Sequence, residues 1–313
     1  MKKEYQTTII SPFLLSGPGL HTGKFIHATV IPAQENTGIV LRRVDGSTMV
    51  DIPALAEYVC GTNHGTTIAV GDKSVSTIEH MMAAFHGMGL DNAIVEVDGP
   101  EVPILDGSAH FWVEGIKSVG LKQLGAERRY YALDKTVEWS DPKSGILMRG
   151  EPFDGFQVFS QIEFESKLIG SQQAVLTDYD QFEREFSRCR TFVFLHEVEA
   201  LLSLNLIKGG DLDNALVFVD KPLGDNEKDR LAKLFNRDPE SIQERDGVLN
   251  TIEPFSPNEP ARHKLLDFIG DIYLCGIRLK GKFTLRCPGH RANTEFAKTI
   301  TKIIKNNNTL LDN

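Results

Sequence analysis

The chain has 313 residues, of which 41% are hydrophobic, 8% aromatic and 25% charged, and these values are ordinary for a globular protein with a substantial core. Its formal net charge of −9 argues against binding to the phosphate backbone of nucleic acids, because proteins that do so normally present a basic face. The four cysteines have no C-x-x-C spacing, the N-terminal apolar run is too short for a signal peptide, and no apolar stretch approaches the roughly 18 residues of a membrane span, so we expect a soluble cytoplasmic protein.

The first half opens with β-branched segments separated by turns, a pattern that predicts strands. These segments are residues 7–10, 26–31, 37–44 and 65–70. The next predicted elements are a helix at 77–89, a strand at 92–98 and a helix at 110–119, with a Gly- and Pro-rich loop before the last. The polar segment "KQLGAERR", residues 122–129, is expected to be a linker.

The second half repeats this plan more loosely. Its predicted strands are residues 129–139, 155–164, 190–194, 214–220 and 281–287, and its predicted helices are 178–186, 196–205, 260–276 and 294–305. We therefore expect an α+β fold of two similar domains, at 1–121 and 130–306, each a sheet layered with helices. The remaining tail, 306–313, is expected to fray.

The stretch "RHKLLDFIGD" places His263, Asp267 and Asp271 four residues apart, so all three project from one side of a helix. A histidine and a carboxylate one turn apart can chelate zinc, which accepts both nitrogen and oxygen ligands. The same stripe also fits the solvated face of an amphipathic helix, and the spacing alone favours that simpler interpretation.

The stretch "STIEH" places Glu79 directly before His80 at the start of a predicted helix. Ser76 and Glu79 have the spacing of a capping box, in which the glutamate binds the backbone N–H of the N-cap residue. Alternatively, Glu79 acts as a base while His80 binds a metal. The next histidine, His86, lies six positions on and about 240° round the helix, so we expect it only to pack.

Two further histidines lie in glycine-containing turns, His21 in "SGPGLHTGK" and His290 in "CPGHRAN". An exposed turn histidine suits proton transfer, although both also fit ordinary turn positions. The first segment fails the phosphate-loop pattern because Pro18 and Phe25 stand where glycine and Ser or Thr are needed. The apolar segment from "RTFVF" onward fits either a buried strand and helix or an apolar ligand pocket.

Taken in order, these stretches resemble the family of UDP-3-O-acyl-N-acetylglucosamine deacetylases, the zinc amidases of lipid A biosynthesis. The resemblance covers nearly the whole chain. It depends on "GLHTGK", "STIEHMMAAFHGMGLDNAIVEVDGPEVPILDGSA", "RTFVF", "RHKLLDFIGDIYLCG" and a "GH" pair followed by Asn293. It implies two α+β domains with the active site at the interface between them.

The resemblance also implies the residues of the site. A catalytic Zn²⁺ would be bound by three residues, two of them on the helix at about 260–275: His80, His263 and Asp267. Glu79 would be the general base that takes a proton from water. His290 would be the protonated partner that stabilises the oxyanion and assists the leaving amine. As a hypothesis, a base and an acid of these types give a bell-shaped pH–rate profile.

Four other roles follow from the same resemblance. Asp271 would tune His290, and Thr191 would help to bind the oxyanion. Lys264 would contact substrate, and Phe192 with the helix after it would line an acyl-chain passage, an insert at about 190–210. Residues 221–260 look longer than the link usual in the family, and the sequence predicts no role for them.

The implied reaction is hydrolysis of a linear amide: the N-acetyl group of a UDP-sugar acylated on its 3-oxygen is released as acetate. We expect a monomer with no nucleic-acid partner. One alternative is a zinc amidohydrolase for a different N-acyl sugar, which would share the zinc ligands but lack the apolar passage. A second alternative is a non-catalytic nucleotide-sugar or RNA-binding protein, and the acidic charge opposes RNA.

Overall fold

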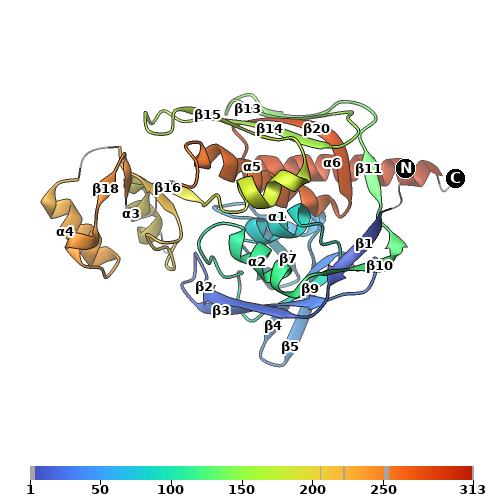
Figure 1. The fold of residues 1–313 in the computed structure, drawn as a ribbon, viewed down its shortest axis with the longest axis horizontal. Helices are drawn as coiled ribbons and strands as arrows, with labels where there is room; N and C mark the ends of the chain where they lie inside the picture. The colour runs from blue at the N-terminus through green and yellow to red at the C-terminus, as the bar shows by residue number, and fades with distance from the viewer. Residues whose placement is uncertain (1–3, 205, 221–222, 250–253, 312–313) are drawn as a thin grey trace.

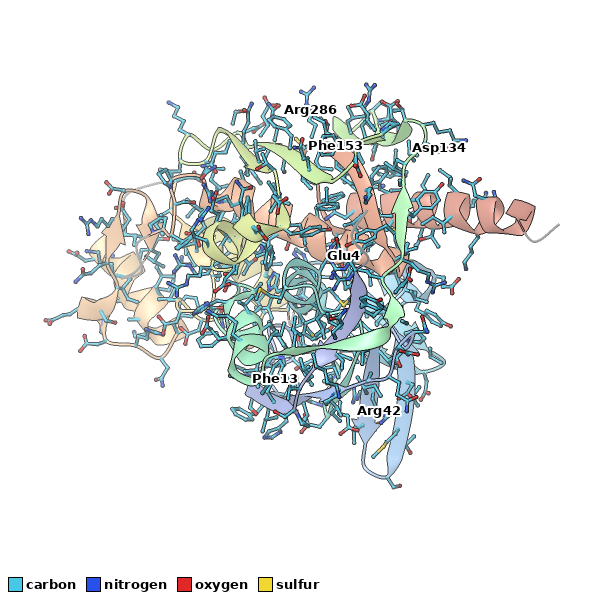
Figure 2. All side chains as sticks on the ribbon, turned by 45° about the vertical axis from the view of Figure 1, so that its right-hand side comes forward. Glu4, Phe13, Arg42, Asp134, Phe153 and Arg286 are labelled. Atoms are coloured by element: carbon cyan, nitrogen blue, oxygen red, sulfur yellow. The ribbon has the colours of Figure 1, made fainter. Side chains whose placement is uncertain are left out.

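Two mixed sheets enclose two layers of helices, and a smaller unit projects from one end (Figure 1). The computed structural model describes residues 4–204, 206–220, 223–249 and 254–311. Side chains from sheets and helices fill the space between the layers, with Arg42 on one sheet and Arg286 on the other (Figure 2). No helix in these ranges is both long enough and apolar enough to cross a membrane.

The first sheet has the strand order β2-β3-β9-β4-β5. Its strands are β2 Phe13–Pro18, β3 Phe25–Pro32, β4 Ile39–Asp45, β5 Thr48–Pro53 and β9 Ala93–Val97. Helices α1 (Glu79–Gly87) and α2 (His110–Val119) lie on its inner face (Figure 1). A three-stranded sheet of β6 (Val59–Gly61), β7 (Thr67–Val70) and β8 (Lys73–Val75) precedes α1.

The second sheet has the order β12-β13-β20-β14-β15, with β11 (Tyr130–Ala132) beside β20. Its strands are β12 Val137–Asp141, β13 Ile146–Glu151, β14 Phe156–Glu163, β15 Ser171–Leu176 and β20 Arg278–Arg286. Helices α5 (Glu259–Ile272) and α6 (His290–Leu311) cover its inner face (Figure 1).

The two main sheets have the same topology. In each, the last strand in the chain, β9 or β20, lies in the middle, antiparallel to the second strand and parallel to the third. One helix precedes this central strand and another follows it, so α1 corresponds to α5 and α2 to α6. The α+β class that the sequence predicts is confirmed, and the similarity of the two halves extends to strand order and direction.

Several elements differ from the sequence-based prediction. Most of the expected linker, 122–129, lies in strand β10 (Leu121–Glu127), which pairs with β1 (Tyr5–Ile9). The expected helix at 178–186 is a 3-10 turn (η2, Tyr179–Gln181) followed by a π-helical turn (η3, Phe182–Phe186). In the tail expected to fray, residues 306–311 continue α6, so the prediction is wrong there, and 312–313 lie outside the described residues.

The projecting unit contains the four-stranded sheet β16-β17-β19-β18 and two helices. Its elements are β16 Phe192–Phe194, α3 Leu195–Ser203, β17 Leu216–Phe218, α4 Asp225–Leu234, η4 Pro239–Ser241, β18 Glu244–Arg245 and β19 Val248–Leu249. It therefore combines the expected insert with most of residues 221–260, although Asn205, 221–222 and 250–253 lie outside the described residues. Leu231, Ala232 and Ile242 pack with Leu195 and Val198 in a separate apolar cluster.

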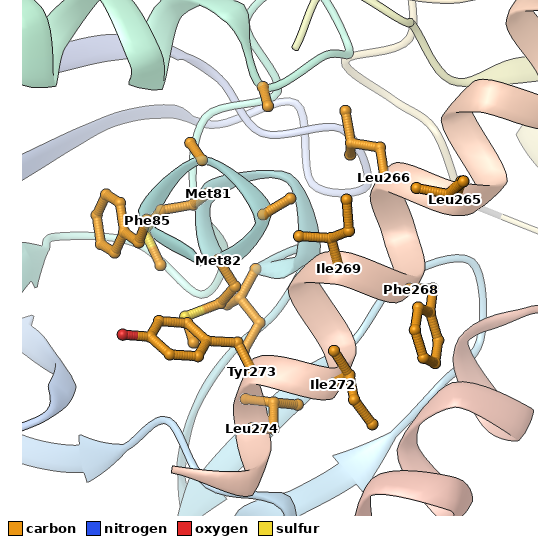
Figure 3. Packing of buried hydrophobic residues seen from close by; sticks show 14 of the residues in the cluster. Met81, Met82, Phe85, Leu265, Leu266, Phe268, Ile269, Ile272, Tyr273 and Leu274 are labelled. Atoms are coloured by element: carbon orange, nitrogen blue, oxygen red, sulfur yellow. The ribbon is translucent and has the colours of Figure 1, made fainter. Parts of the chain in front are cut away.

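Helices α1 and α5 cross closely in the centre of the molecule, where apolar side chains of both interdigitate (Figure 3). A Cβ at Gly270 would overlap the carbonyl oxygen of Glu79 and lie 3.0 Å from the backbone nitrogen of Ala83. Helix α1 ends after one further turn in a Schellman motif, in which Gly89 has φ +78° and Leu90 N–H donates to Phe85 O. Only glycine at position 270 allows the two backbones to approach this closely.

His86 connects three segments across this crossing. Its Nδ1–H donates to Ile269 O of α5 at 2.9 Å, and its Nε2 accepts from the Tyr179 hydroxyl at 2.6 Å. The imidazole is 1% exposed and stacks on the Tyr273 ring. Burial, together with the nearby Arg278 guanidinium, holds the pKa of His86 well below its ordinary value. His86 packs in the core as expected, but it also forms two hydrogen bonds that the expectation of packing alone did not include.

We expect Gly270→Ala to destabilise the protein by at least about 2 kcal/mol, a drop of several degrees in Tm, because backbone atoms of α1 cannot yield to the added methyl group. The matched control is Gly17→Ala, whose methyl group would meet its nearest atoms at ordinary contacts of 3.7 and 3.9 Å. Thermal unfolding of both metal-free variants tests this. Equal Tm values for wild type and Gly270→Ala would contradict the close crossing.

We expect the stability of the protein to fall in acid partly through His86. The unfolded chain binds a proton on this residue below pH about 6.5, whereas the folded protein keeps the imidazole neutral. The free energy of unfolding therefore decreases as the pH falls through about 6.5, by at most about 1.4 kcal/mol per pH unit from this residue. Urea unfolding from pH 5 to 8 should give a shallower dependence for His86→Asn than for wild type. Parallel pH profiles would show that His86 is not held neutral.

Candidate metal centre and active site

The start of α1 and the middle of α5 bring three potential metal ligands together. His80 lies in the first turn of α1, and His263 and Asp267 lie one turn apart on α5. One ligand atom from each lies within 4.8 Å of the others. Asp267 Oδ1 is 3.3 Å from His263 Nε2 and 3.6 Å from His80 Nε2. Two residues distant in sequence from His80 thus complete a cluster that α1 alone could not form.

The polar stripe of α5 is buried. His263 is 1% exposed, and Asp267 and Asp271 are 0% exposed. The interpretation of this stripe as a solvated face is therefore wrong. The spacing cannot show whether the polar face of the helix contacts water or a polar interface inside the protein, because both environments require polar side chains on one side of the helix.

The donor set fits a divalent transition metal. His263 Nδ1–H donates to Cys189 O at 3.0 Å, which leaves the lone pair of Nε2 available to the cluster. Burial lowers the pKa of His263 to about 3, so the ring is neutral. Asp267 Oδ1 is buried and has no hydrogen-bond partner among the described residues. Such an orphaned carboxylate oxygen beside two imidazole nitrogens is what an N,N,O metal site requires.

The second oxygen of Asp267 is bound by Lys264. The Lys264 ammonium donates to Asp267 Oδ2 at 2.9 Å. Although burial opposes ionisation, the Lys264 ammonium and the protonated His290 nearby hold the pKa of Asp267 well below its ordinary range. The carboxylate therefore contributes a full negative charge, which suits a cation at Oδ1.

Glu79 points into the same space and does not cap its own helix. Its Oε2 accepts a hydrogen bond from the backbone N–H of Thr66 at 2.8 Å, and the side chain is 3% exposed. The capping-box interpretation is therefore wrong: the N-cap residue of α1 is Ile78, and Ser76 N–H donates to Pro100 O. A buried carboxylate next to the cluster of potential metal ligands has the position that a general base needs.

His290 begins α6 and faces Glu79 across the cluster. Its Nδ1–H donates to Asp271 Oδ2 at 3.1 Å, and its Nε2 lies 3.8 Å from Glu79 Oε1 and 3.9 Å from Asp267 Oδ2. Burial lowers the pKa of this histidine, but the carboxylates of Glu79, Asp267 and Asp271 outweigh it and raise the pKa to about 9. The imidazole is therefore a cation at neutral pH, with one N–H available to the site.

A cavity of about 280 Å³ extends from His290 and Lys264 into the projecting unit. Thr191 and Phe192 lie on its wall near the cluster, and the Lys264 ammonium is 5.5 Å from the centre of the Phe192 ring. The apolar part of its wall comes from Leu20, Val193, Val198, Leu201, Ile207, Val217 and Phe235. The cavity can hold a long apolar group whose polar end reaches the cluster.

Thr191 is fixed relative to α5. Its N–H donates to Gly107 O at 2.8 Å, and the preceding residue, Arg190, forms a buried ion pair with Glu259 in the first turn of α5. These contacts attach the wall of the cavity to the helix that carries His263.

The structure adds two residues to those identified in the sequence. Thr66 donates its hydroxyl to Asp271 Oδ1 at 2.6 Å, and Asn293 Nδ2 donates to Asp271 Oδ2 at 2.9 Å. Asn293 occurs in one of the quoted motifs, but no role was predicted for it. Thr66 carries no local pattern, and its partner is 205 positions away, so periodicity could not have revealed it.

The sequence matches the family described as "LpxC: UDP-3-O-acyl N-acetylglycosamine deacetylase" over residues 6–237 and 227–302. It is 45% identical over 302 residues to "Bifunctional enzyme LpxC/FabZ" of Porphyromonas gingivalis, a match that covers 96% of this chain but 65% of that protein. It is 39% identical to "UDP-3-O-acyl-N-acetylglucosamine deacetylase" of Teredinibacter turnerae, over 95% of this chain and 90% of the relative. The protein of that name from Geobacter sp. strain M21 is 40% identical, over 96% and 89%.

Proposed function

Because the chain belongs to the UDP-3-O-acyl N-acetylglycosamine deacetylase family, we propose that it hydrolyses the N-acetyl group of a UDP-3-O-acyl-N-acetylglucosamine in lipid A biosynthesis. The products are acetate and the free glucosamine amine. One observation carries the proposal: the cluster of His80, His263 and Asp267 lies beside Glu79 and His290 and close to an apolar cavity.

We propose Zn²⁺ as the metal, with His80, His263 and Asp267 as its ligands. Two imidazoles and one carboxylate form a donor set that zinc accepts, and three protein ligands leave a position open, as in catalytic zinc sites. When bound, Zn²⁺ supplies a Lewis acid that polarises the amide carbonyl and makes a water molecule more acidic.

Glu79 accepts a proton from the attacking water through Oε1, since Oε2 is occupied by Thr66 N–H. The water oxygen bonds to the carbonyl carbon, and the C–N bond then breaks. His290, held by Asp271 through Nδ1, gives the proton on Nε2 to the departing nitrogen. Glu79 returns its proton to His290 after each cycle; the two groups, with Glu79 Oε1 and His290 Nε2 at 3.8 Å, must approach to hydrogen-bond distance for this transfer.

The substrate is held outside the cluster. Thr191 contributes to stabilising the oxyanion, and Lys264 contacts the polar part of the substrate. Phe192 begins the wall along which the 3-O-acyl chain lies. The apolar wall supports this substrate over an N-acyl sugar without an acyl chain, which would leave that surface without a partner.

The domains are proposed as 1–121 and 130–306, joined by 122–129, and the shared strand order of the two sheets supports this division. Both halves of the site come from one chain, which supports activity as a monomer. Four free cysteines support a reducing cytoplasmic location.

We expect purified wild type to bind about one zinc ion per chain and to release acetate from the acylated UDP-sugar. His263→Ala should lose most of the metal and lower kcat/KM more than about a hundredfold, because a metal ligand is removed. His196→Ala, whose side chain is 66% exposed on α3, is the matched control and should retain both. Metal analysis with an acetate assay tests this. Zinc and activity retained in His263→Ala would refute the ligand assignment.

We expect the acyl chain to contribute to binding through the cavity. Ala215→Leu adds three carbon atoms to the cavity wall and should lower kcat/KM for the 3-O-acyl substrate roughly tenfold, since apolar contact of a few methylene groups is lost. The slower reaction of the same sugar without its acyl chain should change less than about twofold. Rates on the two substrates in both proteins test this. An equal loss on both would place the acyl chain elsewhere.

A further inference from the structure

Thr66 connects two functional carboxylates that come from different helices. It is 0% exposed and directly precedes β7. Its backbone N–H donates to Glu79 Oε2 at 2.8 Å, and its hydroxyl donates to Asp271 Oδ1 at 2.6 Å. Glu79 belongs to α1 and Asp271 to α5, so one residue fixes a carboxylate oxygen on each side of the helix crossing.

The opposite oxygens of these two carboxylates face the two nitrogens of one imidazole. Glu79 Oε1 lies 3.8 Å from His290 Nε2, and Asp271 Oδ2 accepts from His290 Nδ1 at 3.1 Å. Thr66, Glu79, His290 and Asp271 therefore form a closed ring of contacts. Within this ring, Thr66 binds one oxygen of each carboxylate, so that the other oxygen faces His290; Asn293 also donates to that oxygen of Asp271.

We propose that Thr66 is a positioning residue that aligns the proposed base and acid as one unit. Its N–H occupies Glu79 Oε2 and leaves Oε1 for the reacting water. Its hydroxyl occupies Asp271 Oδ1 and holds the carboxylate so that Oδ2 receives the imidazole of His290. The roles of these partners rest on the proposed function, whereas the ring itself is a feature of the fold.

The environment of Thr66 supports alignment in preference to substrate binding. Among the described residues that line the cavity, Thr66 is absent. The loop is fixed at the start of α1, because Ile78 N–H donates to Thr66 O at 3.3 Å. It also passes close to the base, since a Cβ at Gly65 would lie 3.2 Å from Glu79 Oε1. Removing the hydroxyl should therefore affect the reaction step and leave substrate affinity nearly unchanged.

The test compares Thr66→Val, which keeps the shape and the N–H but removes the hydroxyl, with Thr66→Ser, which keeps the hydroxyl. We expect Thr66→Val to lower kcat about 10- to 100-fold, because a buried carboxylate loses a hydrogen bond, with KM changed less than about threefold. Thr66→Ser should restore kcat to within about threefold. Thr67→Val, the same change at the neighbouring half-buried residue, is the control and should resemble wild type.

A double-mutant comparison tests whether the loss of kcat in Thr66→Val arises through Asp271 and His290. If Thr66 acts through Asp271 and His290, Thr66→Val should cost less than about threefold in a His290→Ala background. Proton NMR gives a readout independent of activity: the downfield imidazole N–H signal of His290, assigned by its loss in His290→Ala, should shift in Thr66→Val and return in Thr66→Ser.

Several results would overturn the proposal. These are an unchanged kcat and NMR signal in Thr66→Val, a failure of Thr66→Ser to restore them, a full additive loss in the His290→Ala background, or a loss that accompanies metal release or unfolding. A wild-type protein without deacetylase activity would refute the proposed function instead, and the NMR comparison would still decide whether Thr66 aligns His290.

Discussion

The close crossing of α1 and α5 is the constraint on which the site depends. A hydrogen atom in place of a side chain at Gly270 lets the backbone of α5 reach the carbonyl of Glu79. Glu79 and His80 are the first two residues of α1, so this approach brings both against His263, Asp267 and Asp271. A wider crossing would separate ligand atoms that now lie within 4.8 Å. The packing of two helices and the geometry of the cluster are therefore one requirement.

The repeated topology explains why two equivalent helices meet. Each half places one helix before the central strand of its sheet, and the halves face each other through these helices. Burying ionised side chains at such an interface is costly unless each finds partners. Lys264 donates a hydrogen bond to Asp267, and Thr66 and Asn293 each donate one to Asp271. Asp267 Oδ1 has no hydrogen-bond partner in the part of the chain that the structure describes, and a cation of the kind proposed here would provide one.

Local sequence patterns predicted the secondary-structure elements better than they predicted which residues contact one another. The 4-residue spacing of His263, Asp267 and Asp271 predicted one helix face, but the same spacing suits water and an internal interface, and here the face is buried. The Ser76–Glu79 spacing predicted a cap, but Thr66 N–H binds the carboxylate, and Thr66 lies in a loop without periodicity. No role was predicted for residues 221–260, because the packing of Leu231, Ala232 and Ile242 with α3 depends on the folded insert and leaves no local signal in the sequence. Only the ordered set of motifs connected distant residues to one site.

The polar cluster and the apolar cavity require opposite degrees of hydration. Hydrolysis needs a water molecule beside Glu79, whereas an acyl chain binds best where water is excluded. Phe192 and Lys264 lie between these regions: the Lys264 ammonium binds Asp267 and is 5.5 Å from the centre of the Phe192 ring. The methylene groups of lysine can continue the apolar wall while its charge remains with the cluster. One pair of side chains thus separates the polar cluster from the apolar cavity, which is the arrangement that the proposed hydrolysis of an acylated substrate requires.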